Sequence, residues 1–188
     1  MDRPFLRNKK IYMYTLLNGK EGEQMKERDI RDVAAGKLAY GAKTKEELRK
    51  QLQKLGYPIG DIDIVIEEFT DYGYLNDLEY AQSYRRYGER KGWALSRIKR
   101  ELLKKGVDSN DIEDAFKSMD SQDTSDDEYQ RAYTVAAKMA DATDLDDRGR
   151  LEEKVKARIA RRLYGYGYSS DVIYSSLNSL ESELRKNQ

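Results

Sequence analysis

Basic residues recur at helical spacing opposite an apolar stripe in two stretches of the chain. In residues 95–105 the apolar side chains are three or four positions apart, at Leu95, Ile98 and Leu102, which predicts a helix with one buried face. The opposite face carries Arg97, Arg100 and Lys104. A guanidinium group presents a fork of donors, so such a row is suited to phosphate groups or to an acidic protein surface.

Residues 153–163 repeat this arrangement. The apolar stripe there consists of Val155, Ile159 and Leu163, and the opposite row consists of Lys154, Arg158 and Arg161. Simple exposure to solvent also produces a charged helix face, and that interpretation stays open for each stretch taken alone. Arginine recurs at two matched positions of both stretches, which favours a binding track.

Four further basic residues come shortly before the first stretch: Arg85, Arg86, Arg90 and Lys91. They lead to the only tryptophan, Trp93, which either packs between helices or stacks on an exposed base. Residues 85–105 contain nine basic and two acidic residues, although the net charge of the whole chain is zero. We therefore predict that these residues and the two rows form one basic face that binds protein or DNA.

The chain contains no cysteine and no histidine. Thiol catalysis, disulfides, Cys or His metal sites and Ser-His-Asp arrangements are therefore excluded. No two carboxylates are framed by apolar residues as a general acid requires, and Arg148 and Val155 stand where a calcium loop needs oxygen ligands. We expect no catalytic residue, no metal, no cofactor and no enzymatic activity.

An internal repeat positions the basic rows, and its anchors are Gly56, Gly106 and Gly167. Apolar residues stand four and eight positions before each glycine, and six and ten positions after it. This spacing predicts a helix, a break closed by glycine, and a second helix. Thr44 and Glu47 have the spacing of a capping box at the start of the first such helix.

A further helical segment precedes each pair, so we predict an all-α fold of three tandem three-helix repeats in an elongated, curved array. The predicted boundaries are an N-terminal extension at residues 1–24 and repeats at 25–73, 74–120 and 121–188. Repeats of this size need contacts with their neighbours for stability. The apolar run at residues 11–17 is too short to cross a membrane, and we expect a cytoplasmic protein without membrane contact.

The segment YGYLNDLEYAQSYRR, followed by SRIKRELLKKGV, resembles the RecX family of bacterial recombination regulators. The family pattern is Gly-Tyr-Leu-(Asp/Asn)-Asp, an aromatic residue with alanine, and then Ile-x-x-Glu-Leu-x-x-Lys-Gly-Ile. The matching residues are Gly73, Tyr74, Leu75, Asn76, Asp77, Tyr80, Ala81, Ile98, Glu101, Leu102, Lys105, Gly106 and Val107. The chain departs from the family at Ala94 and Leu95, where many members carry Gly-Pro.

The resemblance implies a regulator of RecA that acts in DNA recombination, DNA repair and the SOS response. Such a protein lies along the RecA–single-stranded-DNA filament, blocks its extension, and lowers its ATPase, strand-exchange and coprotease activities. We expect a monomer that contacts the filament without a cofactor. The residues leave open whether the arginines meet RecA or DNA.

Two other hypotheses remain at this stage. One is a general nucleic-acid-binding helical module that acts independently of RecA, because three-helix units also build helix-turn-helix readers. The other is a protein–protein scaffold without a role on DNA.

Overall fold

The computed structural model describes residues 29–117 and 125–186. Within these ranges the chain forms nine α-helices and one short 3-10 helix, and the only β-structure is an isolated bridge between Leu145 and Leu151. The predicted N-terminal extension, residues 1–24, lies outside the described residues. In the described part of the chain, no helix is long and apolar enough to cross a membrane.

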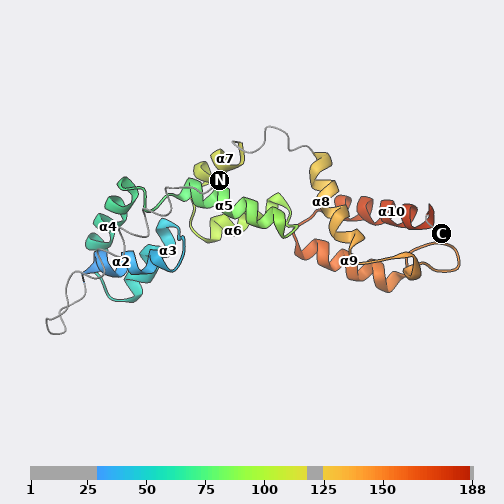
Figure 1. The fold of residues 1–188 in the computed structure, drawn as a ribbon, viewed down its shortest axis with the longest axis horizontal. Coiled ribbons are helices and arrows are strands. Elements are labelled where there is room, and N and C mark those ends of the chain that lie inside the picture. Colours follow the sequence, from blue (N-terminus) through green and yellow to red (C-terminus); the bar gives the residue numbers. More distant parts are fainter. Residues whose placement is uncertain (1–28, 118–124, 187–188) are drawn as a thin grey trace, which may run out of the picture. The chain divides into compact units, whose positions relative to one another are not determined.

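The helices follow one another in three sets of three, which confirms the predicted all-α repeat fold (Figure 1). The first set is α2 (Ile30–Ala39), α3 (Lys45–Lys54) and α4 (Ile59–Asp71). The second set is α5 (Asp77–Arg90), α6 (Leu95–Lys104) and α7 (Ser109–Lys117). The third set is α8 (Ser125–Ala137), α9 (Glu153–Gly165) and α10 (Ser170–Lys186), with the 3-10 helix η1 (Ala142–Asp144) between α8 and α9.

The repeated apolar positions lie in the cores, as the sequence pattern predicted. The side chains four and eight positions before each anchor glycine are fully buried: Leu48, Leu52, Ile98, Leu102, Ile159 and Leu163. Gly56, Gly106 and Gly167 have φ values of 87°, 78° and 93°, in the left-handed region where a side chain would be strained. Each glycine therefore ends one helix and redirects the chain into the next.

Local capping explains where several helices begin and end. Thr44 and Glu47 form the predicted capping box at the start of α3, with the Glu47 N–H donating to Thr44 Oγ1 at 3.0 Å. After α9, the Tyr168 N–H donates to the Leu163 carbonyl, five residues earlier, at 3.2 Å. This bond closes the helix in the manner of a Schellman motif, and Tyr168 is 3% exposed.

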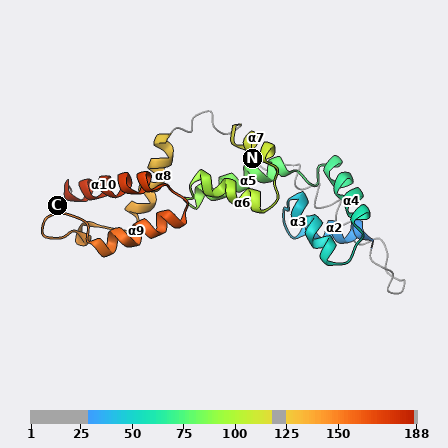
Figure 2. The same ribbon diagram turned by 180° about the vertical axis from the view of Figure 1, so that it is seen from behind.

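The described residues pack into two compact units. The first unit contains α2, α3 and α4, the start of α5 as far as Tyr80, and Lys105–Asp108. Its core includes Leu48, Leu52, Ile62, Val65 and Phe69. The second unit contains the remainder of α5, together with α6 to α10. In both views α8 lies beside α10 within this unit (Figures 1 and 2).

Candidate nucleic-acid interface

Two turns meet in the second unit, and their contact fixes how α5 and α6 stand against α9. The Ala94 N–H donates to the Tyr166 carbonyl at 3.0 Å, and Ser96 Oγ donates to the Gly167 carbonyl at 2.8 Å. The Tyr168 hydroxyl donates to the Gly92 carbonyl at 3.0 Å. Burial raises the pKa of Tyr168 to about 12, so the donor stays protonated at neutral pH. We call the contact of Gly92–Arg97 with Gly165–Tyr168 the second joint.

Arg97 belongs to the second joint and binds the chain itself. Its Nη1 donates to the Gly165 carbonyl at 2.6 Å, and its guanidinium carbon lies 4.1 Å from the centre of the Trp93 ring. Trp93 is half-buried, and its ring centre lies 5.6 Å from that of Tyr87, in an edge-on arrangement. The indole therefore packs among residues of its own unit, and stacking of a DNA base on it stays a prediction.

Arg85 is a buried structural residue rather than part of an exposed face. It is 1% exposed, its Nη1 donates to the Phe116 carbonyl at 2.8 Å, and its Nε donates to Glu89 at 2.7 Å. The guanidinium carbon also lies 4.7 Å from the centre of the Phe116 ring. These contacts tie α5 to α7, because the buried charge is hydrogen-bonded and paired at the same time.

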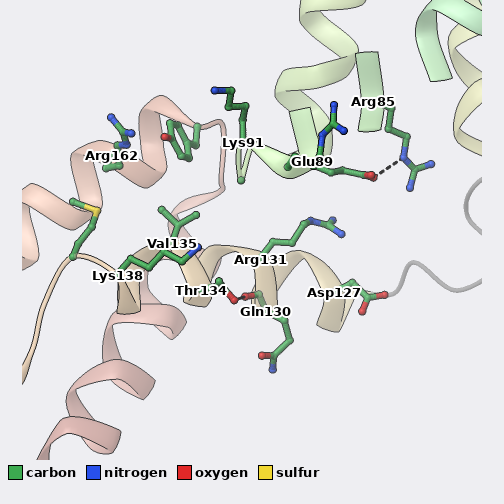
Figure 3. A pocket seen from close by; sticks show the side chains of 14 residues that line it. Arg85, Glu89, Lys91, Asp127, Gln130, Arg131, Thr134, Val135, Lys138 and Arg162 are labelled. Atoms are coloured by element: carbon green, nitrogen blue, oxygen red, sulfur yellow. Dashed lines mark hydrogen bonds and ion pairs between the residues drawn. The ribbon is translucent and has the colours of Figure 1, made fainter. Parts of the chain in front are cut away.

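A groove of about 810 Å³ opens between α5, α8 and α9 of the second unit. Six cationic side chains and two carboxylates line it: Arg85, Arg90, Lys91, Arg131, Lys138, Arg162, Glu89 and Asp127. Figure 3 shows Arg131 projecting from α8, Lys138 from the turn directly after α8, Lys91 from the turn after α5, and Arg162 from α9. The excess of cations gives the groove a positive potential.

Gly92 sets the distance between α8 and the turn after α5. Its φ is +73°, and a Cβ placed there would lie 2.6 Å from Val135 Cγ2. Only glycine fits both the backbone conformation and this close approach. The neighbouring Lys91 is thereby held at the rim of the groove, opposite the α8 residues.

Four of the groove cations are exposed and have no counter-ion among the residues that the structure describes. Arg90, Lys91, Lys138 and Arg162 are all exposed. Within residues 29–117 and 127–186, no ion pair joins any of the four to a carboxylate. Arg162 instead lies over the Tyr166 ring, with 4.6 Å between its guanidinium carbon and the ring centre. These four side chains are available to an anionic ligand without breaking an internal salt bridge.

The other sequence-predicted residues do not line this groove. Arg86 is exposed on α5 and donates to Ser83 Oγ at 3.0 Å. Lys104 pairs with Glu101 at 3.1 Å, and Lys154 pairs with Glu152 at 2.7 Å. Each of these three side chains is thus satisfied, at least in part, by its own helix or the residues beside it.

The three remaining arginines lie on α6 and α9. Arg100 and Arg161 are exposed, as the sequence pattern predicted, and the Nε of Arg161 donates to the Ala157 carbonyl at 3.1 Å. Arg158 Nη2 donates to the Met139 carbonyl at 2.6 Å, near the end of α8. Arg97 and Arg158, at matched repeat positions, thus both donate to a backbone carbonyl of another segment, at Gly165 and at Met139.

Sequence reasoning missed Arg131, Lys138 and Arg162. The first two lie in residues 108–147, which contain thirteen acidic residues and only three basic ones, so the stretch is acidic on average. Arg131 lies on α8, Lys138 lies in the turn directly after α8, and both line the groove. Position in the fold, rather than the charge of the whole stretch, identifies them.

The first unit contains a contact of related geometry but different chemistry. Thr44 Oγ1 donates to the Lys105 carbonyl at 2.6 Å, and Lys105 Nζ lies 2.7 Å from Glu47 Oε1. Burial alone would lower the pKa of the Lys105 ammonium, but hydrogen bonds with Glu47 and Tyr80 outweigh burial and raise it. We call the contact of Thr44–Glu47 with Lys105–Gly106 the first joint.

Three cations on the helices of the first unit are paired with carboxylates of the same unit. Arg31 lies 2.7 Å from Glu68, Arg49 lies 2.6 Å from Asp63, and Lys50 lies 3.2 Å from Glu46. The bond with Glu68 raises the pKa of Arg31 and lowers the pKa of Glu68. Four cations of the second unit's groove have no such carboxylate partner among the described residues.

Residues 76–115 match a family model described as RecX, second three-helix domain. The chain is 30% identical over 172 residues to the regulatory protein RecX of Mycolicibacterium vanbaalenii, and the match covers 89% of each protein. It is 27% identical over 177 residues to the regulatory protein RecX of Bacillus velezensis, covering 87% of this chain and 64% of that relative's length.

Solved structures show the same fold. The chain matches the crystal structure of RecX from Lactobacillus salivarius with a TM-score of 0.64 at 27% identity, covering 81% of this chain and 95% of that one. A second crystal structure, of a regulatory protein RecX, matches with a TM-score of 0.61 at 20% identity and supports the fold alone.

Proposed function

Because the chain belongs to the RecX family of regulatory proteins, we propose that it binds the RecA filament on single-stranded DNA and restrains it. The proposed effects are slower filament extension and lower ATPase, strand-exchange and coprotease activities. The observation that carries the proposal is the cationic groove between α5, α8 and α9. In the bound state its exposed cations face the phosphates of the DNA that runs through the filament.

The chemistry of the groove favours a phosphate backbone. Arg90 and Arg162 offer planar forks of donors, and Lys91 and Lys138 offer point charges on flexible stems. Binding of phosphates to such groups releases condensed counter-ions, which provides affinity independent of base sequence. A regulator that must act anywhere along a filament needs this kind of sequence-independent contact.

Local order supports the same role. The second joint fixes the turn that carries Lys91, and Arg162 is oriented by the Tyr166 ring beneath it. Side chains held in place lose less conformational entropy on binding than freely rotating ones. The groove is thus a prepared surface rather than a chance gathering of lysines.

The test is a titration of the ATPase activity of RecA on single-stranded DNA with this chain, at amounts below one per RecA subunit. We expect progressive slowing at these ratios. No slowing at any ratio would refute the proposal. DNA binding without any effect on the ATPase would instead support the alternative of a general nucleic-acid-binding module.

A further inference from the structure

In the described part of the chain, the start of another helix covers two of the three anchor glycines and leaves the third uncovered. A Cβ added at Gly106 would overlap Glu46 Cβ in the first joint, and one added at Gly167 would lie 2.6 Å from Arg97 Cβ in the second joint. At Gly56, among the residues that the structure describes, nothing lies within 4 Å of an added Cβ. The turn between α3 and α4 is the same repeated element, but no helix start among the described residues packs on it.

The two occupied joints show what this element accepts. In the first joint Thr44, twelve positions before Gly56, donates to the carbonyl of Lys105, the residue before Gly106. In the second joint Ala94, twelve positions before Gly106, donates to the carbonyl of Tyr166, the residue before Gly167. In both joints, a second side chain of the covering segment contacts the side chain of the residue whose carbonyl accepts this bond; it lies nine positions before Gly56 in the first joint and nine before Gly106 in the second. Glu47 meets Lys105 as an ion pair, and Arg97 meets Tyr166 as a cation above a ring.

In the uncovered turn, Leu55 occupies the position of Lys105 and Tyr166. Leu55 is 54% exposed, and Ile59, four residues later, is 64% exposed. Pro58 between them is exposed as well. The other two repeats carry serine at the position of Ile59, namely Ser109 and Ser170. The uncovered turn is therefore the one with apolar side chains directed at solvent.

We propose that the turn formed by Leu55, Gly56, Pro58 and Ile59 docks the first turn of an α-helix of the filament protein. The first unit then supplies the contact with protein, and the groove of the second unit supplies the contact with DNA. This inference rests on the proposed function, which provides a filament protein as the partner.

The occupied joints define the chemistry of the occupant. A helix start brings a hydroxyl or a free N–H, which the Leu55 carbonyl accepts in the way that the Lys105 and Tyr166 carbonyls do. The partner side chain in each joint matches its neighbour: an acid for Lys105 and a cation for the Tyr166 ring. By the same rule, the side chain that meets Leu55 is apolar. Burial of exposed apolar side chains at such a contact is a strong source of affinity.

The test uses the full chain with the double substitution Leu55→Glu and Ile59→Glu. Its matched control is Ile64→Glu, which makes the same apolar-to-acid change at a residue that is 52% exposed on α4 of the same unit. Binding to preformed RecA filaments and to free single-stranded DNA is measured for each variant. We expect the double variant to bind filaments at least about tenfold more weakly, with DNA affinity unchanged, and Ile64→Glu to match the wild type in both.

Each other outcome decides against the inference. Wild-type affinity of the double variant for filaments would overturn it and leave the proposed function intact, whereas a wild-type chain that binds no filament would remove the proposed function itself. If the double variant, but not Ile64→Glu, sedimented in the absence of filaments with a smaller mass than the wild type, the turn would be a contact with a second copy of this chain. If the double variant, but not Ile64→Glu, had a lower melting temperature than the wild type, the turn would be covered by other residues of the same chain.

Discussion

The first and second joints use the same repeated geometry with opposite chemistry. In the first joint an acid, Glu47, meets the cation Lys105. In the second joint a cation, Arg97, meets the aromatic rings of Trp93 and Tyr166. A repeat thus conserves where side chains meet, while the identity of the pair is free to change.

The two units also differ in the charged side chains outside the joints. Arg31, Arg49 and Lys50 of the first unit are paired with carboxylates. In the second unit, the contacts of Arg97 with the aromatic rings involve no carboxylate. Tyr166 of the second joint also lines the groove, where Arg90, Lys91, Lys138 and Arg162 have no carboxylate partner in the part of the chain that the structure describes. The two units are therefore predicted to respond differently to mutation, salt and pH.

The largest expected effect comes from reversing the charge of the groove. The variant with Arg90, Lys91, Lys138 and Arg162 all changed to Glu should bind single-stranded DNA about 10- to 1000-fold more weakly, if each contact contributes what an exposed ion pair does. The slope of log affinity against log salt should fall by about 0.7 for each lost phosphate contact. Fluorescence anisotropy at several salt concentrations measures both quantities.

The matched control for this variant reverses two cations outside the groove, Lys104 and Lys154, each of which pairs with a neighbouring acid. We expect nearly unchanged DNA affinity and salt slope. If this control lost as much affinity as the groove variant, the assignment of DNA binding to the groove would be wrong.

The next effect is on stability and separates buried from exposed arginine. Arg85→Ala should lower the free energy of unfolding by about 3 kcal/mol, because the Phe116 carbonyl and Glu89 lose a buried partner. Arg85→Met keeps most of the packing and should cost less. Denaturant titration followed by circular dichroism measures both, and an Arg85→Ala variant as stable as the wild type would contradict the structural role.

A third pair of variants contrasts the joints directly. Arg97→Ala removes a charged hydrogen bond and a cation–aromatic contact and should destabilise the second unit by about 2 kcal/mol. Lys105→Ala removes a half-exposed ion pair and should destabilise the first unit by less than about 1 kcal/mol. Hydrogen exchange of α3 and α9 amides reports each unit separately.

Salt sharpens this contrast. Added salt should reduce the Lys105→Ala effect, because screening weakens a partly exposed ion pair, and should leave the Arg97→Ala effect nearly constant. Equal salt dependence of the two effects would show that the joints do not differ in chemistry as described.

A further small effect concerns Tyr168. Tyr168→Phe removes the hydrogen bond to Gly92 and should cost about 1 kcal/mol near pH 8. Because burial raises the pKa of Tyr168 to about 12, the folded state holds the phenol proton more tightly than the unfolded state. The stabilising contribution of this proton is complete below pH 10 and is lost as the pH rises toward 12. The stability difference between wild type and Tyr168→Phe should therefore shrink from pH 9 to pH 11.5 in denaturant titrations, and a constant difference would contradict it.

Local patterns made much of the fold predictable. The stripe of Ile98 and Leu102, the left-handed turn at Gly106 and the capping box of Thr44 and Glu47 each depend on residues a few positions apart, and each appears as predicted. These features arise from helix periodicity and backbone sterics, which act over one or two turns.

The site was less predictable because its contacts join distant segments. Arg97 faces outward by helical periodicity, yet its partner carbonyl at Gly165 is 68 residues away. The Phe116 carbonyl that holds Arg85 is 31 residues away from it. Arg131 and Lys138 were hidden by the acidic average of their stretch, although both line the groove, Arg131 from α8 and Lys138 from the turn after it. Charge sums over a segment do not resolve which face of a helix a residue occupies.

We propose that DNA runs through the groove between α5, α8 and α9, and site-specific cross-linking tests this proposal. The chain contains no cysteine, so one introduced thiol carries the only label. Thr134→Cys places a photo-cross-linker on an exposed residue of the groove, and Lys54→Cys places it on an exposed residue of the first unit. With RecA filaments on single-stranded DNA, we expect cross-links to DNA from position 134 and none from position 54. DNA cross-links of equal yield from both positions, or from position 54 alone, would contradict it.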